Sequence, residues 1–314
     1  MRILVTGGAG FIGSHFVSAT LRNHPDVTLT ILDLFTYAAC PEVVDAEKRA
    51  FPHRLEVVHG DVRDHSTVDR LVSRADTVVH FAAESHNDRA LADAAPFLTT
   101  NVMGTYCVVE ACARHDVRLH HVSTDEVFGD LPLDSEDVFT EHSPYRPSSP
   151  YSASKAAADH LVRAWARTHG LRATISISSN TYGTRQHREK FIPHSIACRL
   201  AGRAPEIYGS GQNVRDWIHV SDHVEAIWAI LTHGRLGRTY LVSANNPRSN
   251  LDVAGEINAA FGRPRDDLTF VKDRPGHDLR YTLDPTLLTA ETGWRPRHTD
   301  MSAGLREVIG WMRG

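Results

Sequence analysis

The sequence predicts an α/β fold: a Rossmann-like, doubly wound parallel sheet followed by a smaller C-terminal substrate-binding lobe. Three observations support this prediction. Short, β-rich apolar runs alternate with helical patterns through the first half of the chain, and a glycine-rich loop follows the first run. After about residue 180, repeated prolines divide the chain into shorter segments. The length of 314 residues also suits two domains.

The expected strands are nearly continuous apolar runs, as burial on both faces of a parallel sheet requires. They cover residues 2–6, 28–32, 55–58, 77–81, 119–123 and 173–178. Besides a first helix at the glycine-rich loop, helical patterns lie between them at residues 64–73, 97–115 and 150–169. Ser149 is the expected N-cap of the last helix, and Pro150 is its first residue. Such alternation predicts right-handed crossovers into one sheet.

The same pattern predicts the domain organisation. Residues 1–180 would form the sheet domain, with residues 213–243 returning to it, and residues 181–314 would form the second lobe. The net charge of −4 does not indicate a nucleic-acid-binding protein, which would usually be basic. No apolar run approaches the ~18 residues that a membrane-spanning helix needs. Four scattered cysteines without a CxxC motif indicate neither zinc nor a disulfide framework. With no signal-peptide pattern, we expect a cytoplasmic protein.

A GxxGxxG pattern follows the first expected strand and opens the first helix. Gly7, Gly10 and Gly13 are its framework glycines, and Phe11 and Ile12 lie between the last two. A helix N-terminus offers backbone N–H groups and a partial positive charge to a pyrophosphate, and glycines let the backbone approach it closely. A tight structural turn would explain the glycines alone equally well. In this context, the pattern predicts a dinucleotide site.

Two carboxylates indicate which dinucleotide fits. Asp33 closes the second expected strand about 20 residues after the loop, where a carboxylate accepts both adenosine-ribose hydroxyls and repels a 2′-phosphate. Asp61 follows the third strand, next to Val62, and can accept a hydrogen bond from an adenine amino group. The sequence therefore predicts NAD rather than NADP.

Tyr151 and Lys155 form a YxxxK pair at the start of the 150–169 helix. Positions i and i+4 share a helix face, so the ammonium can favour the phenolate and hold a nicotinamide ribose. Ser123 and Thr124 end the fifth expected strand and supply a hydroxyl for the reacting carbonyl or alcohol. The sequence has a glycine-rich loop, then a hydroxyl residue at a strand end, then the YxxxK pair. This order of motifs resembles that of the extended short-chain dehydrogenase/reductase superfamily.

Longer segments are similar to the dTDP-glucose 4,6-dehydratase family, over nearly the whole chain. The most specific are Thr-Asp-Glu at residues 124–126 and Asp-Arg-Pro-Gly-His-Asp-Leu-Arg-Tyr at residues 273–281. Further similar segments lie at residues 83–86, 189–193 and 214–217. The resemblance implies dehydration of a nucleoside-diphosphate hexose, with dTDP-glucose favoured, to the 4-keto-6-deoxy sugar.

Adjacent carboxyls suit this reaction, because one must abstract the C5 proton and the other must protonate the departing C6 hydroxyl. By the resemblance, Glu126 is the base, Asp125 is the acid and Thr124 polarises C4. Tyr151, held by Lys155, would take the proton of the C4 hydroxyl. The alternative is that Asp125 and Glu126 are ordinary solvated loop acids.

The resemblance also implies binding residues outside these motifs. For the cofactor they are Ala82, Ala83 and Thr100. For the sugar nucleotide they are Ser85, Asn180, Glu189, Lys190, Tyr208, Arg215, Asn250, Arg274 and His277. Arg215 and Arg274 are preferred for the diphosphate, because a guanidinium grips phosphate through two parallel N–H bonds. The alternative for each residue is a surface cation or a turn.

Several positions depart from the family pattern. Asn87 stands where a small apolar residue is usual, and Thr181 replaces the second Asn of a paired-Asn motif. Thr184 replaces a Pro, Phe128 a frequent Tyr, and Cys40 an Asn. Because Asn87 and Thr181 lie near the expected sugar pocket, they leave the hexose and the nucleotide base open.

The 20 histidines include one pair with metal-like spacing. His219 and His223 are four residues apart, but only the second is expected in a helix and no third ligand has suitable spacing. His120 and His121 lie in a buried strand and are more consistent with packing than with chemistry. We therefore expect no metal.

Two other functions stay open at this point. A nucleotide-sugar 4-epimerase or decarboxylase on the same scaffold needs the Thr, Tyr and Lys, but not the Asp-Glu pair. A non-catalytic NAD-binding sensor would need neither the Tyr nor the Lys. The acidic pair at residues 125 and 126 favours the dehydratase over both.

The resemblance further implies a homodimer. Residues 97–115 and 150–169 would form its four-helix interface. Gly104, Val108, Ala157 and Leu161 are compatible with such an interface, and equally with packing on the sheet.

Overall fold

The computed structural model describes residues 1–314. The chain divides into two compact units. The first unit contains residues 1–124, 149–177 and 227–240, and the second contains residues 125–148, 178–226 and 241–314. The sequence places one boundary near residue 180 and returns residues 213–243 to the first domain. In the structure, the return to the first unit is limited to residues 227–240, and residues 125–148 join the second.

A seven-stranded sheet with strand order β10-β6-β5-β4-β1-β2-β3 is the framework of the first unit. The strands are β1 (Arg2–Thr6), β2 (Thr28–Asp33), β3 (Leu55–His59), β4 (Thr77–His80), β5 (Arg118–Thr124), β6 (Ala173–Ser178) and β10 (Thr239–Val242). The pairs among β1 to β5 are parallel. All six predicted strands are present, with ends that differ by at most one residue. Except for the added edge strand β10, this is the Rossmann order.

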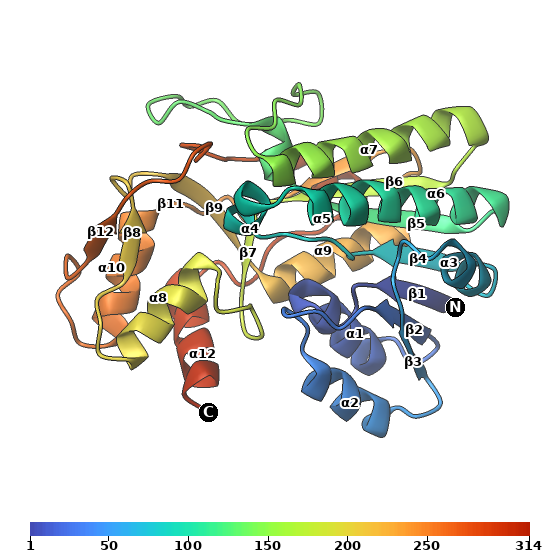
Figure 1. The fold of residues 1–314 in the computed structure, drawn as a ribbon, viewed down its shortest axis with the longest axis horizontal. Helices are drawn as coiled ribbons and strands as arrows, with labels where there is room; N and C mark the ends of the chain where they lie inside the picture. The colour runs from blue at the N-terminus through green and yellow to red at the C-terminus, as the bar shows by residue number, and fades with distance from the viewer. The chain divides into compact units, whose positions relative to one another are not determined.

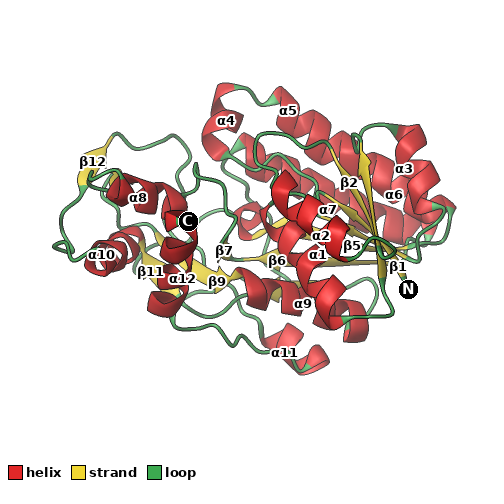
Figure 2. Ribbon diagram, turned by 90° about the horizontal axis from the view of Figure 1, so that it is seen from below, coloured by secondary structure: helices red, strands yellow, loops and turns green.

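Helices cover both faces of this sheet (Figures 1 and 2). On one face lie α1 (Phe11–Asn23), α2 (Pro41–Ala50) and the end of α9 (Val220–His233). Trp228 of α9 stacks on Phe16 of α1, with ring centroids 5.7 Å apart. On the other face, α3 (His65–Val72), α6 (Thr105–Arg114) and α7 (Pro150–His169) lie side by side. Two apolar helical layers thus bury the sheet.

The helix expected at residues 97–115 is wound differently from the prediction. It begins as α5 (Ala95–Phe97), continues as the π-helical segment η1 (Leu98–Gly104) and ends as α6. A Cβ at Gly104 would lie only 2.7 Å from Val62 Cγ2, so this turn packs directly on the loop after β3. The π-helical segment is too short for its different number of residues per turn to be seen in the spacing of apolar residues. Helix α2 is likewise absent from the prediction.

The second unit is built from two small sheets and a group of helices. The sheet orders are β11-β9-β7 and β12-β8. The strands are β7 (Asn180–Tyr182), β8 (Glu206–Tyr208), β9 (Val214–His219), β11 (Pro247–Ser249) and β12 (Thr269–Val271). The helices are α8 (Phe191–Leu200), α10 (Asn250–Ala260), α11 (Thr286–Thr292) and α12 (Met301–Arg313). Tyr182, Trp217 and Leu305 belong to one buried core with side chains of α8 and α10. No helix is long and apolar enough to cross a membrane.

Candidate active site

The glycine-rich loop has a geometry that only glycine permits. Gly7 has φ +70°, and a Cβ there would lie 2.6 Å from the backbone nitrogen of Ala82. A Cβ at Gly13 would overlap the carbonyl oxygen of Gly7. Gly10 is the N-cap of α1 and places no capping side chain over the first turn, where Phe11 and Ile12 begin the helix. The first-turn amides of α1 therefore suit the pyrophosphate of a dinucleotide.

Asp33 ties the end of β2 to this loop. Its carboxylate accepts hydrogen bonds from the backbone N–H groups of Ala9 and Phe35, both at 2.8 Å. Burial raises the pKa of Asp33, and the two backbone bonds oppose this rise. A carboxyl acceptor at this strand end fits a ribose diol, so the residues present fit NAD.

Asp61 is oriented by an arginine that sequence reasoning missed. Arg63 donates from Nε to Asp61 Oδ1 at 3.0 Å and from Nη2 to Oδ2 at 2.5 Å. Hydrogen bonding from Arg63 lowers the pKa of Asp61. The neighbouring Val62 is buried beside Gly104. The Asp61 carboxylate is therefore ionised and oriented by Arg63.

The loop after β4 carries Ala82, Ala83 and Ser85 and is held by Asn101, another residue that sequence reasoning missed. Asn101 is buried in η1, next to Thr100. Its Oδ1 accepts from the backbone N–H of Glu84 at 2.8 Å, and its Nδ2 donates to the carbonyl of Glu84 at 3.0 Å. Nδ2 also lies 2.8 Å from Ser154 Oγ. The sequence carries no clear signal for this role, because Asn101 follows two other polar residues, Thr99 and Thr100.

Tyr151 and Lys155 lie in the first turns of α7, which begins where predicted. Ser149 and Ser152 form a reciprocal capping box at its N-terminus. Lys155 is buried, and its Nζ donates to the carbonyl of Val122 in β5 at 2.8 Å. Burial lowers the pKa of Lys155 to about 8. The ammonium is thereby fixed between α7 and the strand that ends at Thr124.

Asp159 continues this arrangement one helical turn further along α7. It is fully buried and accepts a hydrogen bond from Ser123 Oγ at 2.8 Å. Its other oxygen lies 3.1 Å from His121 Nε2. The carboxylate counteracts the burial that lowers the pKa of Lys155. The sequence predicts that His120 and His121 only pack inside the sheet. His120 agrees with this, since it is buried and bonds the hydroxyls of Thr174 and Ser176 in β6, whereas His121 also contacts the Asp159 carboxylate.

The structure also gives Asn87 a partner. Ser149 Oγ donates to Asn87 Oδ1 at 2.9 Å, so this departure from the family pattern supports the N-cap of α7.

The two histidines with metal-like spacing, His219 and His223, have different partners. Thr181 Oγ1 lies 2.8 Å from His223 Nδ1, and burial lowers the pKa of His223 to about 4. His219 ends β9 and lies 3.6 Å from Glu307. The two spaced histidines therefore have separate partners.

Asp125 and Glu126 open the short 3₁₀ turn η2 (Asp125–Phe128) in the second unit. Asp125 is buried, whereas Glu126 is half-buried. The turn closes at Gly129, whose φ of +81° and contact with the carbonyl of Arg146 admit no side chain. Two adjacent carboxyls are thus presented in different surroundings, directly after the strand that ends at Thr124.

The loop that follows η2 contacts residues 273–281 within the second unit. Asp130 Oδ1 accepts from the backbone N–H groups of Leu279 at 2.6 Å and Arg280 at 3.1 Å. Asp278 accepts from Tyr281 and is itself buried, and burial raises the pKa of both groups. The Glu126 carboxylate raises both pKa values further. Asp278 and Tyr281 are therefore neighbours of the proposed base, although no residue role was predicted for them.

Arg215 is held rigidly beside this cluster. Its guanidinium lies over the Tyr281 ring at 4.3 Å and donates to the carbonyls of Val214, Asp278 and Leu279 at 2.8, 2.8 and 3.3 Å. These three bonds use three of its five N–H donors. The plane of the guanidinium is therefore set before any ligand arrives.

Tyr208 and His277 form a second group. The Tyr208 ring meets the His277 ring edge-on at 6.3 Å, and His277 Nδ1 lies 2.7 Å from Asp273 Oδ1. Burial lowers the pKa of His277. The backbone N–H of Arg274 donates to the same Asp273 oxygen at 2.8 Å. Three predicted substrate residues are thus brought together at the end of β8.

The remaining predicted substrate residues occupy separate places in the second unit. Asn180 begins β7, and its Oδ1 is buried without a hydrogen-bond partner in the protein. Glu189 and Lys190 immediately precede α8, of which Lys190 is the N-cap. Asn250 is the first residue of α10. The orphaned Asn180 acceptor fits a hydroxyl or N–H donor from a ligand.

Comparison with known proteins agrees with these features. The family model described as GDP-mannose 4,6 dehydratase matches residues 4–308. A dTDP-glucose 4,6-dehydratase of Mycolicibacterium smegmatis is 56% identical over 313 residues, which are 100% of this chain and 93% of the relative. The crystal structure of a Streptomyces venezuelae dTDP-glucose 4,6-dehydratase with NAD bound has a TM-score of 0.95 and 42% identity, covering 100% and 97% of the two chains. A Bacillus anthracis dTDP-glucose 4,6-dehydratase with NAD has a TM-score of 0.91 and 35% identity, covering 100% and 96%.

Proposed function

This chain belongs to the dTDP-glucose 4,6-dehydratases, and from that premise we propose how its residues divide the reaction. It is an NAD-dependent hydro-lyase that converts dTDP-glucose to the 4-keto-6-deoxy sugar. The reaction oxidises C4, eliminates water across C5 and C6, and returns the hydride to C6. The observation that carries the proposal is the run Thr124, Asp125 and Glu126 at the end of β5, because 4-epimerisation needs no such acid–base pair.

The chain's residues hold and use the cofactor as follows. The α1 N-terminus binds the pyrophosphate, Asp33 the adenosine ribose and Asp61 the adenine. Ala82 and Ala83 follow β4, and Thr100 lies in η1 next to the Asn101 that holds this loop, so all three are assigned to the cofactor. When bound, NAD supplies the hydride acceptor for C4 and the hydride donor for C6. Lys155 holds the nicotinamide ribose.

Three side chains move protons in the reaction: Tyr151, Glu126 and Asp125. Tyr151 accepts the proton of the C4 hydroxyl, and the Lys155 charge favours the phenolate that does so. Thr124 hydrogen-bonds the C4 oxygen. The new C4 carbonyl makes the C5 proton acidic, and Glu126 removes it while Asp125 protonates the departing C6 hydroxyl. Glu126 later returns its proton to C5. Tyr151 has gained one proton and Asp125 has lost one, so proton exchange with solvent restores both groups and the net by-product is one water.

Burial supports this division of roles. A carboxyl withdrawn from water is more easily kept neutral than one in contact with solvent. Asp125 is buried and suits the protonated acid, whereas the half-buried Glu126 suits the ionised base. Different surroundings for neighbouring carboxyls are a general way to obtain an acid and a base from one residue type.

The substrate residues divide between two ligand parts. Arg215 and Arg274 bind the diphosphate, with Lys190 as a further cation. Tyr208 packs on the base and His277 donates to the diphosphate or sugar. Asn180, Ser85, Glu189 and Asn250 hydrogen-bond the sugar nucleotide. The preset plane of Arg215 lowers the ordering cost of phosphate binding.

A homodimer through the η1–α6 and α7 helices is also proposed, with one change from the sequence-based expectation. Gly104 and Val108 are buried within their own chain and cannot serve the interface. Leu98 and Met103 of η1 are instead 52% and 51% exposed, an apolar pair suited to a partner helix.

We further propose a cytoplasmic location, because all four cysteines carry thiols rather than disulfides.

The function is tested by incubating the enzyme with dTDP-, UDP- and GDP-glucose and weighing the products by mass spectrometry. Loss of one water, fastest with dTDP-glucose, is the expected result. An isobaric product would indicate epimerisation and overturn the assignment to Asp125 and Glu126. No turnover of any of the three would overturn the catalytic function itself.

A further inference from the structure

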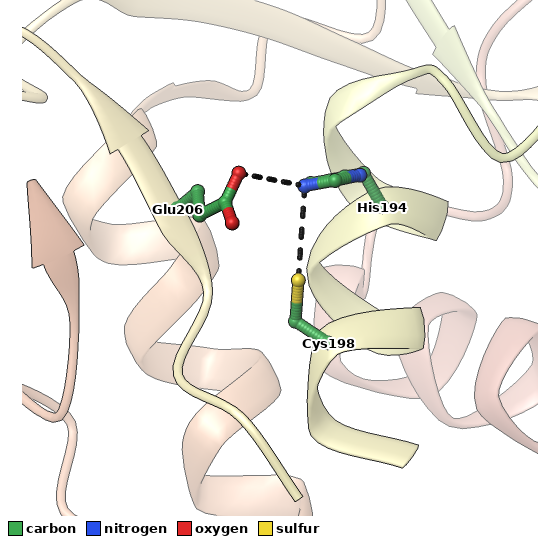
Figure 3. Close-up of side chains that lie close together, drawn as sticks. All are labelled: His194, Cys198 and Glu206. Carbon is green, nitrogen blue, oxygen red and sulfur yellow. Dashed lines mark hydrogen bonds and ion pairs between the residues drawn. The ribbon is translucent and has the colours of Figure 1, made fainter. Parts of the chain in front are cut away.

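Three metal-binding side chains meet at a place in the second unit that the dehydratase reaction does not use. His194 and Cys198 lie one turn apart on α8, and Glu206 begins the neighbouring strand β8. Figure 3 shows all three pointing toward one another. His194 Nε2 lies 3.3 Å from Glu206 Oε2 and 3.7 Å from Cys198 Sγ, and all three ligand atoms lie within 4.8 Å of one another.

The two separations from His194 Nε2 are close to the edge lengths of a tetrahedral zinc site. Zinc binds cysteine sulfur at about 2.3 Å, histidine nitrogen at about 2.0–2.1 Å and carboxylate oxygen at about 2.0–2.2 Å. A tetrahedral angle between such bonds separates the ligand atoms by about 3.4–3.6 Å. The observed distances from His194 Nε2 therefore need only small side-chain adjustments to accept the ion.

The surroundings combine access with partial enclosure. The side chains of His194 and Glu206 are 41% and 40% exposed, so an ion can enter from solvent, whereas Cys198 is buried. Burial raises the pKa of the Cys198 thiol, and zinc would bind the thiolate by displacing its proton. Arg203 pairs with the other Glu206 oxygen at 3.3 Å, and Arg199 is occupied by Asp267 at 2.9 Å. One thiolate and one carboxylate then balance the charge of the ion.

We propose that His194, Cys198 and Glu206 form a zinc site, with water as the fourth ligand. The ion would join α8 to β8. Glu189 and Lys190 immediately precede α8, and Tyr208 ends β8, so a bound ion would restrain two segments that carry proposed substrate residues. This consequence rests on the proposed function, but metal binding itself does not.

Cobalt titration of the metal-free, NAD-loaded full chain under a non-chelating reductant tests the proposal. One Co²⁺ per chain should bind, with a near-ultraviolet thiolate-to-cobalt band and the strong visible bands of tetrahedral coordination, and Zn²⁺ should displace it. C198S should abolish the thiolate band. H194Q and E206Q should each weaken Zn²⁺ binding by roughly 100-fold or more, beyond the cost of losing an outer-shell partner.

Matched controls separate this site from adventitious binding by other histidines. H233A removes an exposed histidine and C40S removes another thiol, and both should keep the band and the affinity. Cobalt binding without a thiolate band, or a band that survives C198S, would overturn the proposal, as would an absence of binding. If C198S fails to fold by circular dichroism, the H194Q and E206Q affinities decide. Dehydration of dTDP-glucose is measured separately, so either result can fail alone.

Discussion

The two units hold their functional groups in different ways. In the first unit, reactive groups depend on burial and regular structure: Lys155 is fixed to the carbonyl of Val122, and Asp159 lies fully buried one turn further on. In the second unit, functional side chains are held by backbone groups of segments far away in the chain. Arg215 is held by three loop and strand carbonyls, and Asp130 binds two backbone N–H groups about 150 residues later in the chain.

This difference indicates a division of labour. A buried ammonium and a buried carboxylate have strongly coupled charges, so the first unit controls proton transfer at C4 and binding of the cofactor, whereas the acid–base pair Asp125 and Glu126 belongs to the second unit. Side chains on loops are replaced at little cost to the scaffold, so the second unit is suited to set which nucleotide sugar is bound. Mutations of the cofactor-binding residues in the first unit and of the phosphate-binding residues in the second should therefore affect different measured quantities.

The largest expected effect is that of E126Q. A glutamine cannot accept the C5 proton, so kcat should fall by roughly 10²–10⁴-fold, the usual contribution of a general base. Mass spectrometry of the product in deuterated buffer checks this, because the base also governs entry of solvent deuterium at C5. The control E136Q changes an exposed carboxylate in the same segment and should leave kcat intact. Normal turnover of E126Q would show that another group is the base.

R215K should affect substrate affinity and leave the cofactor alone. Lysine lacks the planar fork, and loss of charge-assisted bonds to phosphate costs about 1.5–3 kcal/mol, or roughly 10- to 150-fold in KM for dTDP-glucose. Calorimetric titration with NAD should show an unchanged Kd. R263K, at an exposed position of the same unit, is the control. Equal losses for NAD and sugar nucleotide would contradict the division between units.

D33A is the reciprocal test in the first unit. Removal of the ribose acceptor should weaken NAD binding by about 1.5–3 kcal/mol, while the KM for dTDP-glucose at saturating NAD stays within about twofold. The loss of a negative charge should also improve binding of NADP relative to NAD. Fluorescence titrations with both cofactors measure this ratio. An unchanged ratio would mean that Asp33 serves only the loop amide of Ala9.

The first unit was more predictable from sequence than the second, for a physical reason. The Gly7–Gly13 loop and the Tyr151–Lys155 pair are local patterns, because a helix start and an i, i+4 face are set by near neighbours. The roles of Asn101 and Asp159 were not predicted, because both depend on the burial of the side chain. A polar residue in a helical segment does not show from the sequence whether it is buried. In the second unit, Asp278 depends on the pairing of distant segments, since it binds Ser148, 130 residues earlier in the chain, and the His194 cluster depends on the turn that brings β8 back beside α8.

Asp159 offers a pH test of the first unit. Burial lowers the pKa of Lys155 to about 8 and the Asp159 carboxylate opposes that change, so D159N should lower the pKa further. Activity requires charged Lys155 and is lost as pH rises through its pKa. The alkaline limb of kcat/KM should therefore move to lower pH, by about one unit. D69N, at a half-buried carboxylate that pairs with Arg114 away from Lys155, should leave the limb in place. A limb that does not move would show that Asp159 acts on folding alone.

The smallest expected effect concerns Asn87, which departs from the family pattern in the first unit. N87A removes one hydrogen bond from the Ser149 cap, worth about 0.5–1.5 kcal/mol, so the midpoint of thermal unfolding should fall by a few degrees. S149A removes the cap itself and should cost about the same or more. If Asn87 serves the helix cap, N87A should leave the preference among dTDP-, UDP- and GDP-glucose unchanged. A changed preference without a change in unfolding temperature would instead place Asn87 in sugar recognition, and the first unit would then share the selectivity assigned here to the second.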